Sequence, residues 1–430
     1  MKGSFQIIVI VIFIFAAIFG VLVFSGAIPI GTNNSPGALG TVTLWGTVPQ
    51  RALTAILEEF NNVNTSFALK YIQKSEDTFD QDLLEALAGG VGPDMVLLPD
   101  DLVFQYSNKI FAIPYNSYSL ALFKNNFASA GEVFLSSRGV LAFPLSIDPL
   151  VMYYNRSMLD TAGVIAPPAS WDDLVGLIPK FTVKDDSSKI TKSTIALGHF
   201  SNVVHAKDIL ATLFMQAGNF ILSEKDGILA STLGNPSNKY NLSSILKFYT
   251  DFADPNKPVY SWNKSFPNSR DAFSSESLAF YFGFASELIS LVNKNPNQNF
   301  AVAPMPQIKN SNFKLTGARV LGVAILSSSK NLNTAFTAAN LLSSSDFASR
   351  FVSVTGVAPA LRSLLAKKPV DAFSPIFYNS ALFARSWIDP SPSGTDAIFR
   401  NMIEGVISNK MTTEAAISDA NGRLNLLLYK

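Results

Sequence analysis

Cysteine is absent from the 430 residues, and charged side chains make up only 15% of them. Without cysteine the chain has no disulfide framework, no thiolate metal site, no cysteine nucleophile and no lipid-modified cysteine anchor. Lys and Arg number 33 against 32 Asp and Glu, a formal net charge of +1. A broad positive surface for a phosphate backbone is therefore missing, and we expect no nucleic-acid partner.

Signatures of catalysis are equally scarce. The two histidines, His199 and His205, do not form an HExxH pair, so we expect no metal site. No GxSxG, GxxxxGK[ST] or GxGxxG motif occurs, and we expect no cofactor. His205 is most simply a structural or surface histidine. Asp100 and Asp101 could pair as in glycoside hydrolases, but adjacent acids in a loop are usually caps or solvated groups. We therefore expect a protein that is not an enzyme.

A long apolar stretch opens the chain. Residues 7–24 read IIVIVIFIFAAIFGVLVF without a charge, and as a helix they would span about 27 Å, close to the apolar thickness of a bilayer. Lys2 supplies the positive flank that stays in the cytoplasm. We expect residues 1–26 to anchor the protein outside the cell membrane, with a cleaved signal peptide ending near Ala27 and a buried core helix as alternatives. Residues 27–40 are rich in Pro, Gly, Asn and Ser and predict a linker.

The rest of the chain predicts an α/β fold. TVTLWGT at 41–47 is typical of a strand, and the apolar spacing of Leu53, Ile56, Leu57 and Phe60 predicts a helix after it. Ser170 and Asp173 indicate a helix-capping box. Further strands are expected at 67–72, 95–98, 139–143, 151–154, 278–282, 300–302 and 321–326, and further helices at 80–87, 171–178, 207–217, 242–252, 287–292 and 332–342.

One ordered block carries a family resemblance. Residues 141–174 read LAFPLSIDPLVMYYNRSMLDTAGVIAPPASWDDL: a strand ending in Pro, a YN pair, a helix closing on AG, then PP, Trp and two acids. This order resembles the extracellular solute-binding proteins of family 1, the maltose-binding-like receptors of ABC importers. The resemblance covers 41–429 and is supported by TLWG at 43–46, GPD at 92–94, FSSESLAFYFG at 273–283, APMP at 303–306 and GVAP at 356–359.

The resemblance implies a two-lobed, periplasmic-binding-protein-like fold of type II, with a ligand cleft between two α/β lobes. The first lobe is expected at 41–152 and 316–365, and the second at 153–315 and 366–430. Three crossing segments would join them near 150–154, 314–317 and 367–370. Closure of the lobes on ligand would be a hinge motion. Three features that are usual in the family are missing. Ser275 stands where the family usually has a glycine, Phe284 and Ala285 stand where it often has a Trp, and the Cys to which a lipid is attached is absent.

The resemblance also implies where a ligand is bound. Trp45 and Trp387 could be stacking platforms or core residues, Asp101 a ligand contact or a loop cap, and Arg319 a ligand contact or a surface ion pair. Of Tyr153 and Tyr154, one should face the cleft and the other the core. Trp171 should pack at the start of a helix, and Trp262 should lie at the cleft rim or on the surface. The expected ligand contacts are Trp45, Asp101, Tyr153, Gly283, Phe284, Arg319, Trp387 and Phe399.

We therefore expect a monomeric, membrane-anchored receptor that captures a sugar or oligosaccharide outside the cell and delivers it to the permease of an ABC importer. A receptor for an anionic solute or a peptide is the first alternative, and Arg319 makes an anion conceivable. A sensory protein that docks on a receptor kinase and an anchored glycoside hydrolase are the others.

Overall fold

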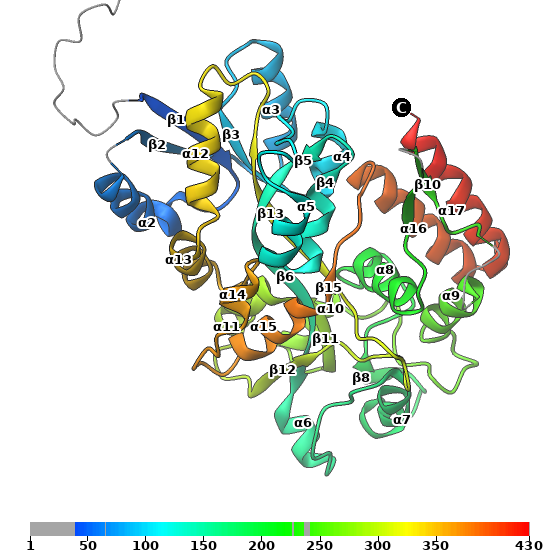
Figure 1. The fold of residues 1–430 in the computed structure, drawn as a ribbon. Helices are drawn as coiled ribbons and strands as arrows, with labels where there is room; N and C mark the ends of the chain where they lie inside the picture. Colours follow the sequence, from blue (N-terminus) through cyan, green and yellow to red (C-terminus); the bar gives the residue numbers. More distant parts are fainter. Residues whose placement is uncertain (1–38, 65, 226–227, 236–240, 430) are drawn as a thin grey trace, which may run out of the picture.

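The computed structural model describes residues 39–64, 66–225, 228–235 and 241–429. These residues form two α/β lobes that lie side by side (Figure 1). The predicted anchor at 7–24 and most of the predicted linker lie outside the described residues. Within the described ranges, none of the helices combines the length and the apolar character needed to cross a membrane.

The first lobe is built around a parallel sheet. β1 (Thr41–Gly46) lies between β2 (Ala68–Gln73) and β3 (Met95–Pro99), parallel to both. Side chains of β1 alternate between buried and partly exposed, whereas β3 is buried from Met95 to Leu98, as its unbroken apolar sequence predicts. The other elements of this lobe are α2 (Gln50–Val63), α3 (Phe79–Ala88), η1 (Asp100–Leu102), α4 (Val103–Tyr106), α5 (Leu120–Asn126), η2 (Ser129–Phe134), β4 (Leu135–Ser136), β5 (Gly139–Val140), α12 (Leu332–Leu342), α13 (Ser345–Thr355), β14 (Ala358–Pro359) and α14 (Arg362–Leu365).

One strand, β6 (Ala142–Asn155), belongs to both sheets. Its first part pairs with β13 (Thr316–Ile325) in the first lobe, and its part from Leu150 onward pairs with β11 (Leu278–Phe284) in the second. We predicted two strands separated at Pro144 and Pro149, and this prediction is wrong. The ladder accommodates Pro144 at a register shift and Pro149 at its end, places where a missing N–H is tolerated.

A second strand, β13, crosses between the lobes beside β6. β13 pairs with β3 and β6 in the first lobe, and at Thr316 and Gly317 it pairs with the short strand β15 (Ala384–Arg385). The Thr316 hydroxyl donates a hydrogen bond of 2.6 Å to the carbonyl of Leu150, which ties β13 to β6 at the crossing. The lobe boundaries drawn from the sequence stay a prediction.

The second lobe packs helices around its own sheet. β11, buried along its whole length, lies between β6 and β8 (Ile190–Ile195), and β12 (Phe300–Pro304) pairs with the other edge of β6. Its other elements are α6 (Arg156–Thr161), α7 (Trp171–Phe181), β7 (Val183–Lys184), α8 (Ala206–Gln216), β9 (Leu222–Lys225), β10 (Ile228–Ser231), α9 (Leu242–Asp251), α10 (Ser269–Ser274), η3 (Ala285–Glu287), α11 (Leu288–Lys294), α15 (Ser374–Leu382), α16 (Pro392–Ile407) and α17 (Thr413–Leu428).

Three local predictions about this lobe have clear outcomes. The capping box is confirmed, because the Ser170 hydroxyl accepts from the Asp173 N–H while the Asp173 carboxylate accepts from the Ser170 N–H. Trp171 is buried at the start of α7 and donates to Gln216, which confirms its packing role. Trp262 is fully buried and stacks on Phe266 at 4.4 Å between ring centroids, so its predicted place at the rim or surface is wrong.

Candidate ligand-binding cleft

A cleft of about 750 Å³ separates the two lobes. Its floor is formed by the loops that follow β1 and β3, at the carboxyl ends of parallel strands, where ligands of open α/β sheets commonly bind. Ser286, Ile289 and Pro392 complete it from the second lobe. The volume lies in the range of ordinary small-molecule sites. This cleft is therefore the candidate site.

Two adjacent acids line the wall of the first lobe. They stand in η1, directly after β3. Asp100 is buried and accepts a hydrogen bond from the Ser386 hydroxyl. Burial, together with repulsion from Asp101, raises the pKa of Asp100 to about 7. Asp101 is exposed to the cleft, and no described residue forms a hydrogen bond or salt bridge with its carboxylate. Loss of solvation inside the cleft raises the pKa of Asp101 too, against the opposing charge of Arg319.

Asp148 and Arg319 face one another on the crossing strands β6 and β13. Asp148 accepts a hydrogen bond of 2.9 Å from the N–H of Ser286, so it links the crossing to the second lobe. Burial raises the pKa of Asp148, and the bonds from Ser286 oppose that rise. Arg319 Nη2 lies 3.3 Å from Asp208 Oδ2, and its Cζ lies 4.1 Å from the ring centroid of Phe284. β6 and β13 thus each hold a charged side chain at the junction, the place where these strands pass from one lobe to the other.

The wall of the second lobe rests on a buried network around Glu287. One oxygen of its carboxylate accepts from the Phe284 N–H at 2.8 Å and lies 2.6 Å from His205 Nε2. The other accepts from the Tyr281 hydroxyl at 2.7 Å and from Arg270 Nε at 2.5 Å. Burial alone would raise the pKa of Glu287, but the bonds from these partners outweigh it and hold the pKa at about 2.

The network extends to the cleft through the first turn of α8. His205 Nδ1 lies 3.7 Å from Asp208 Oδ2, the atom that also contacts Arg319. His205 has φ of +63°, an uncommon conformation for a residue other than glycine. Lys207 on the same turn is bound to Asp389 at 3.2 Å, which fixes the loop that leads to Pro392. Every charged group on this turn already has a partner within the protein.

The structure places the predicted contacts in different environments. Asp101 and Arg319 line the cleft. Trp45 is half-buried in β1 with the Lys74 ammonium 3.9 Å over its ring, and Trp387 is half-buried against Phe399. Neither tryptophan lines the cleft. The remaining predicted contacts, all of them buried, are Tyr153, Gly283, Phe284 and Phe399.

The buried residues have structural partners. The Tyr153 hydroxyl donates a hydrogen bond of 2.8 Å to the carbonyl of Phe284 inside the core. A Cβ added to Gly283 would lie 2.5 Å from the Tyr281 ring and 2.9 Å from Glu287, so the backbone passes too close for any side chain. Phe399 is 0% exposed. These residues support the cleft wall from behind and present no ring or group to the cleft itself.

Sequence reasoning missed several charged residues of the junction. Asp148 offered a signal, because it is an acid between Ile147 and Pro149 in an otherwise apolar strand. A charge at such a position calls for a partner or a function. Asp208 and Glu287 offered none, since their positions depend on contacts between segments far apart in the chain. The expectation that His205 is structural agrees with its place in the network.

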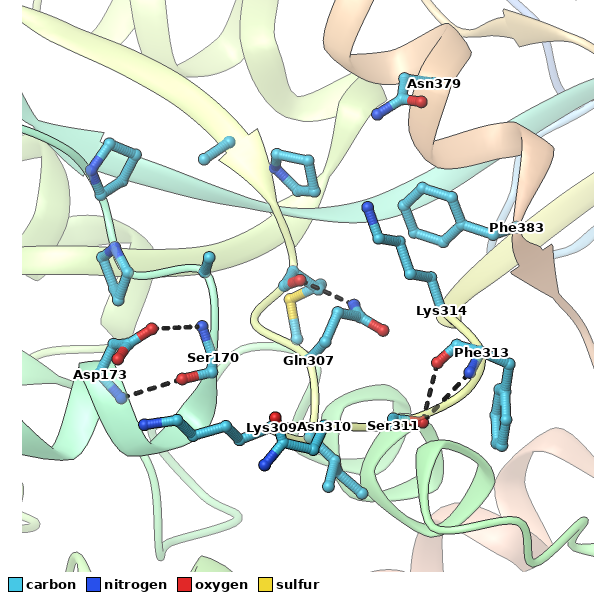
Figure 2. Close-up of a pocket in the computed structure, with 17 residues that line it drawn as sticks. Ser170, Asp173, Gln307, Lys309, Asn310, Ser311, Phe313, Lys314, Asn379 and Phe383 are labelled. Carbon is cyan, nitrogen blue, oxygen red and sulfur yellow. Dashed lines mark hydrogen bonds between the residues drawn. The ribbon is translucent and has the colours of Figure 1, made fainter.

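A second cavity, of about 430 Å³, lies on the second lobe between the start of α7 and the segment leading to β13 (Figure 2). Several of its polar groups serve the fold. Ser170 and Asp173 cap α7, Gln307 binds the carbonyl of Met305 and the N–H of Leu315, and Ser311 binds Phe313. The cleft between the lobes is larger and lies at the ends of parallel strands, so we place the candidate site there.

Comparison with known sequences identifies the family. The profile of the bacterial extracellular solute-binding proteins matches residues 46–349, well over half of the chain. The chain belongs to this family, which confirms the resemblance read from 141–174. A protein of Brucella abortus (strain 2308) named as a binding protein is 25% identical over 123 residues, 28% of this chain. The match spans 29% of that relative's length.

Solved structures share the whole fold. A cyclo/maltodextrin-binding protein complexed with maltotetraose superimposes with a TM-score of 0.71 at 18% identity, covering 92% of this chain and 98% of that one. A cyclic alpha-maltosyl-1,6-maltose binding protein from Arthrobacter globiformis gives 0.73 at 16% identity, with 90% and 98% covered. These similarities show that the fold is the two-lobed α/β fold of solute-binding proteins.

Proposed function

We propose that this protein is the extracytoplasmic receptor of an ABC importer and captures a sugar or oligosaccharide by closing its two lobes. The cleft of about 750 Å³ at the crossing strands is the observation that carries the proposal. Carboxylates that line the cleft can accept hydrogen bonds from sugar hydroxyls, and a buried hydroxyl left without a partner would cost binding energy. Several similar structures are of proteins solved with oligosaccharides, which supports a sugar.

Asp101 and Arg319 are the predicted contacts that we retain for the ligand, because both line the cleft. We add Asp148 and Ser286, which meet across the junction. The lobe boundaries of 41–152 with 316–365, and 153–315 with 366–430, remain part of this proposal. So do the anchor at 7–24, the location outside the cytoplasmic membrane and the permease as partner.

Isothermal titration calorimetry against mono- and oligosaccharides tests the proposal. We expect one glycan class to bind one site per chain, with recovery of the unchanged sugar afterwards. Tight binding of a non-sugar solute, with none to sugars, would contradict the sugar assignment. Release of a shortened glycan would instead identify a hydrolase. An Asp101→Asn variant should weaken binding, whereas Asp172→Asn, the same change on an exposed residue outside the cleft, should not.

A further inference from the structure

The charges that line the cleft are mostly negative. Two guanidinium groups, Arg51 and Arg319, stand against a larger set of carboxylates. Building on the proposed function, we infer that the captured sugar carries a protonated amine. The carboxylates that line the cleft are Glu76, Asp80, Asp100, Asp101 and Asp148.

The guanidinium at the crossing is already occupied. Arg319 contacts Asp208 at 3.3 Å and covers the ring of Phe284 at 4.1 Å. Its charge therefore compensates an acid of the protein instead of recruiting an anionic solute. Lys207, the ammonium nearby on α8, is held by Asp389 and by Thr395. Arg51 alone, on the first turn of α2, adds a positive charge without a salt bridge among the described residues.

The acids, in contrast, have acceptor capacity left. Asp101 has neither a hydrogen bond nor a salt bridge among the described residues, and Asp148 accepts from Ser286 alone. A carboxylate has about four lone-pair sites, and an ammonium has three donors and no acceptor. Burial raises the pKa values of Asp100, Asp101 and Asp148 against the charge of Arg319, so a further cation beside these acids would favour their ionised forms. An ammonium bound between them would form charge-assisted hydrogen bonds, which are stronger than those of a hydroxyl.

Among the residues that the structure describes, the cleft offers no exposed aromatic ring on which a sugar could stack, so stacking does not replace the polar contacts with the acids. The aromatic residues that line the cleft are Phe79 and Phe351, and both are buried, at 2% and 1% exposure. A sugar in this cleft would be held mainly by polar contacts with the acids. Such contacts distinguish an amine from a hydroxyl at the same carbon, which stacking on a ring face would not.

Two trisaccharides that differ only at C2, a hydroxyl in one and an amine in the other, provide the experiment. Cellotriose carries hydroxyls at each C2, and its fully deacetylated glucosamine counterpart carries ammonium groups there at mildly acidic pH. We expect calorimetry to show binding of the amino sugar about tenfold tighter or more. Asp101→Asn should remove most of that preference, high salt should reduce it, and Asp172→Asn should leave it unchanged. Equal affinity, or a preference for cellotriose, would overturn the inference.

Spermidine, a cation without a sugar ring, separates this inference from the proposed function. If cellotriose binds as tightly as the amino sugar, the proposed function as a sugar receptor is supported and the inference that the sugar carries an amine is contradicted. If spermidine binds and neither trisaccharide does, the cleft selects a cation and the proposal that the ligand is a sugar is contradicted. If all three probes and the glycan panel fail to bind, both are contradicted.

Discussion

The two walls of the cleft handle charge in opposite ways. On the second lobe, Glu287 accepts bonds from four groups and Asp208 contacts both His205 and Arg319. On the first lobe, Asp101 has no such partner among the described residues. The second wall is thus preorganised by the protein itself, while Asp101 on the first wall keeps its full acceptor capacity. Stability should therefore depend on the second wall and binding on the first.

The largest effect is expected at Glu287. Glu287→Ala leaves Arg270 and His205 without their buried partner, and breaking a buried ion network in this way costs about 3 to 5 kcal/mol. Urea unfolding followed by circular dichroism measures the loss. Glu58→Ala, at an exposed position of α2, is the control and should change stability by less than about 0.5 kcal/mol. Equal losses for both variants would refute the contrast between the walls.

The pH dependence of the two walls should have opposite signs. Burial holds the native pKa of Asp100 at about 7, above its ordinary 3.8, so the native state binds this proton more tightly than the unfolded chain does. Stability from this group is full below about pH 4 and falls as pH rises toward 7. Glu287, with its pKa lowered from 4.5 to about 2, contributes stability above pH 4.5 that is lost as pH falls toward 2.

Asp100→Asn isolates the first of these effects. The variant removes the buried charge but keeps an acceptor for Ser386, so it should be more stable than the parent protein above pH 7 by roughly 1 to 3 kcal/mol. Below pH 4 the difference should vanish. Urea unfolding at a series of pH values checks this, with Asp172→Asn as control. A constant difference at every pH would show that charge burial is not its cause.

A variant of Tyr153 tests whether this residue supports the cleft wall or contacts the ligand. Tyr153→Phe removes the hydroxyl that donates to Phe284, and loss of a buried hydrogen bond should cost about 1 to 2 kcal/mol of folding stability. Ligand affinity should change less than about threefold, because the residue is 0% exposed. Calorimetry beside thermal unfolding separates the two quantities. A large loss of affinity at unchanged stability would make Tyr153 a ligand contact.

The smallest effect is expected at Arg319. Its side chain is 54% exposed, so the ion pair with Asp208 is screened by solvent. Arg319→Gln should cost less than about 1 kcal/mol, and high salt should abolish the difference. Thermal unfolding at two salt concentrations measures it. A cost that persists in high salt would show that stacking on Phe284 outweighs the ion pair.

Local patterns predicted most elements of the fold. The helix predicted at 332–342 has the bounds of α12, and the strand at 41–47 became β1. The continuity of β6 was missed, because Pro144 and Pro149 each suggest a break in a strand. The pairing skips Leu145 of β6 beside Pro144 and ends at Pro149, and both features exist only against β13, which lies far away in the sequence.

The site was less predictable than the fold. Asp101 lies in η1 just after β3 and Arg319 lies within β13, and the family resemblance pointed to both residues, which line the cleft. Tyr153, Phe284 and Phe399 were expected at the ligand, yet all three are buried. An aromatic side chain suits a core as well as a binding face, and only tertiary packing decides between them. The partners of Glu287 come from three separate segments, so sequence patterns carry no sign of them.

Because β6 supplies hydrogen bonds to both sheets, neither half of the molecule can lose its sheet without leaving unpaired backbone in the other. Heat or denaturant should melt the two halves together in one cooperative transition. A protease cut within 142–155 would then release no stable fragment from either side. The strand that joins the two halves therefore makes them a single unit of folding.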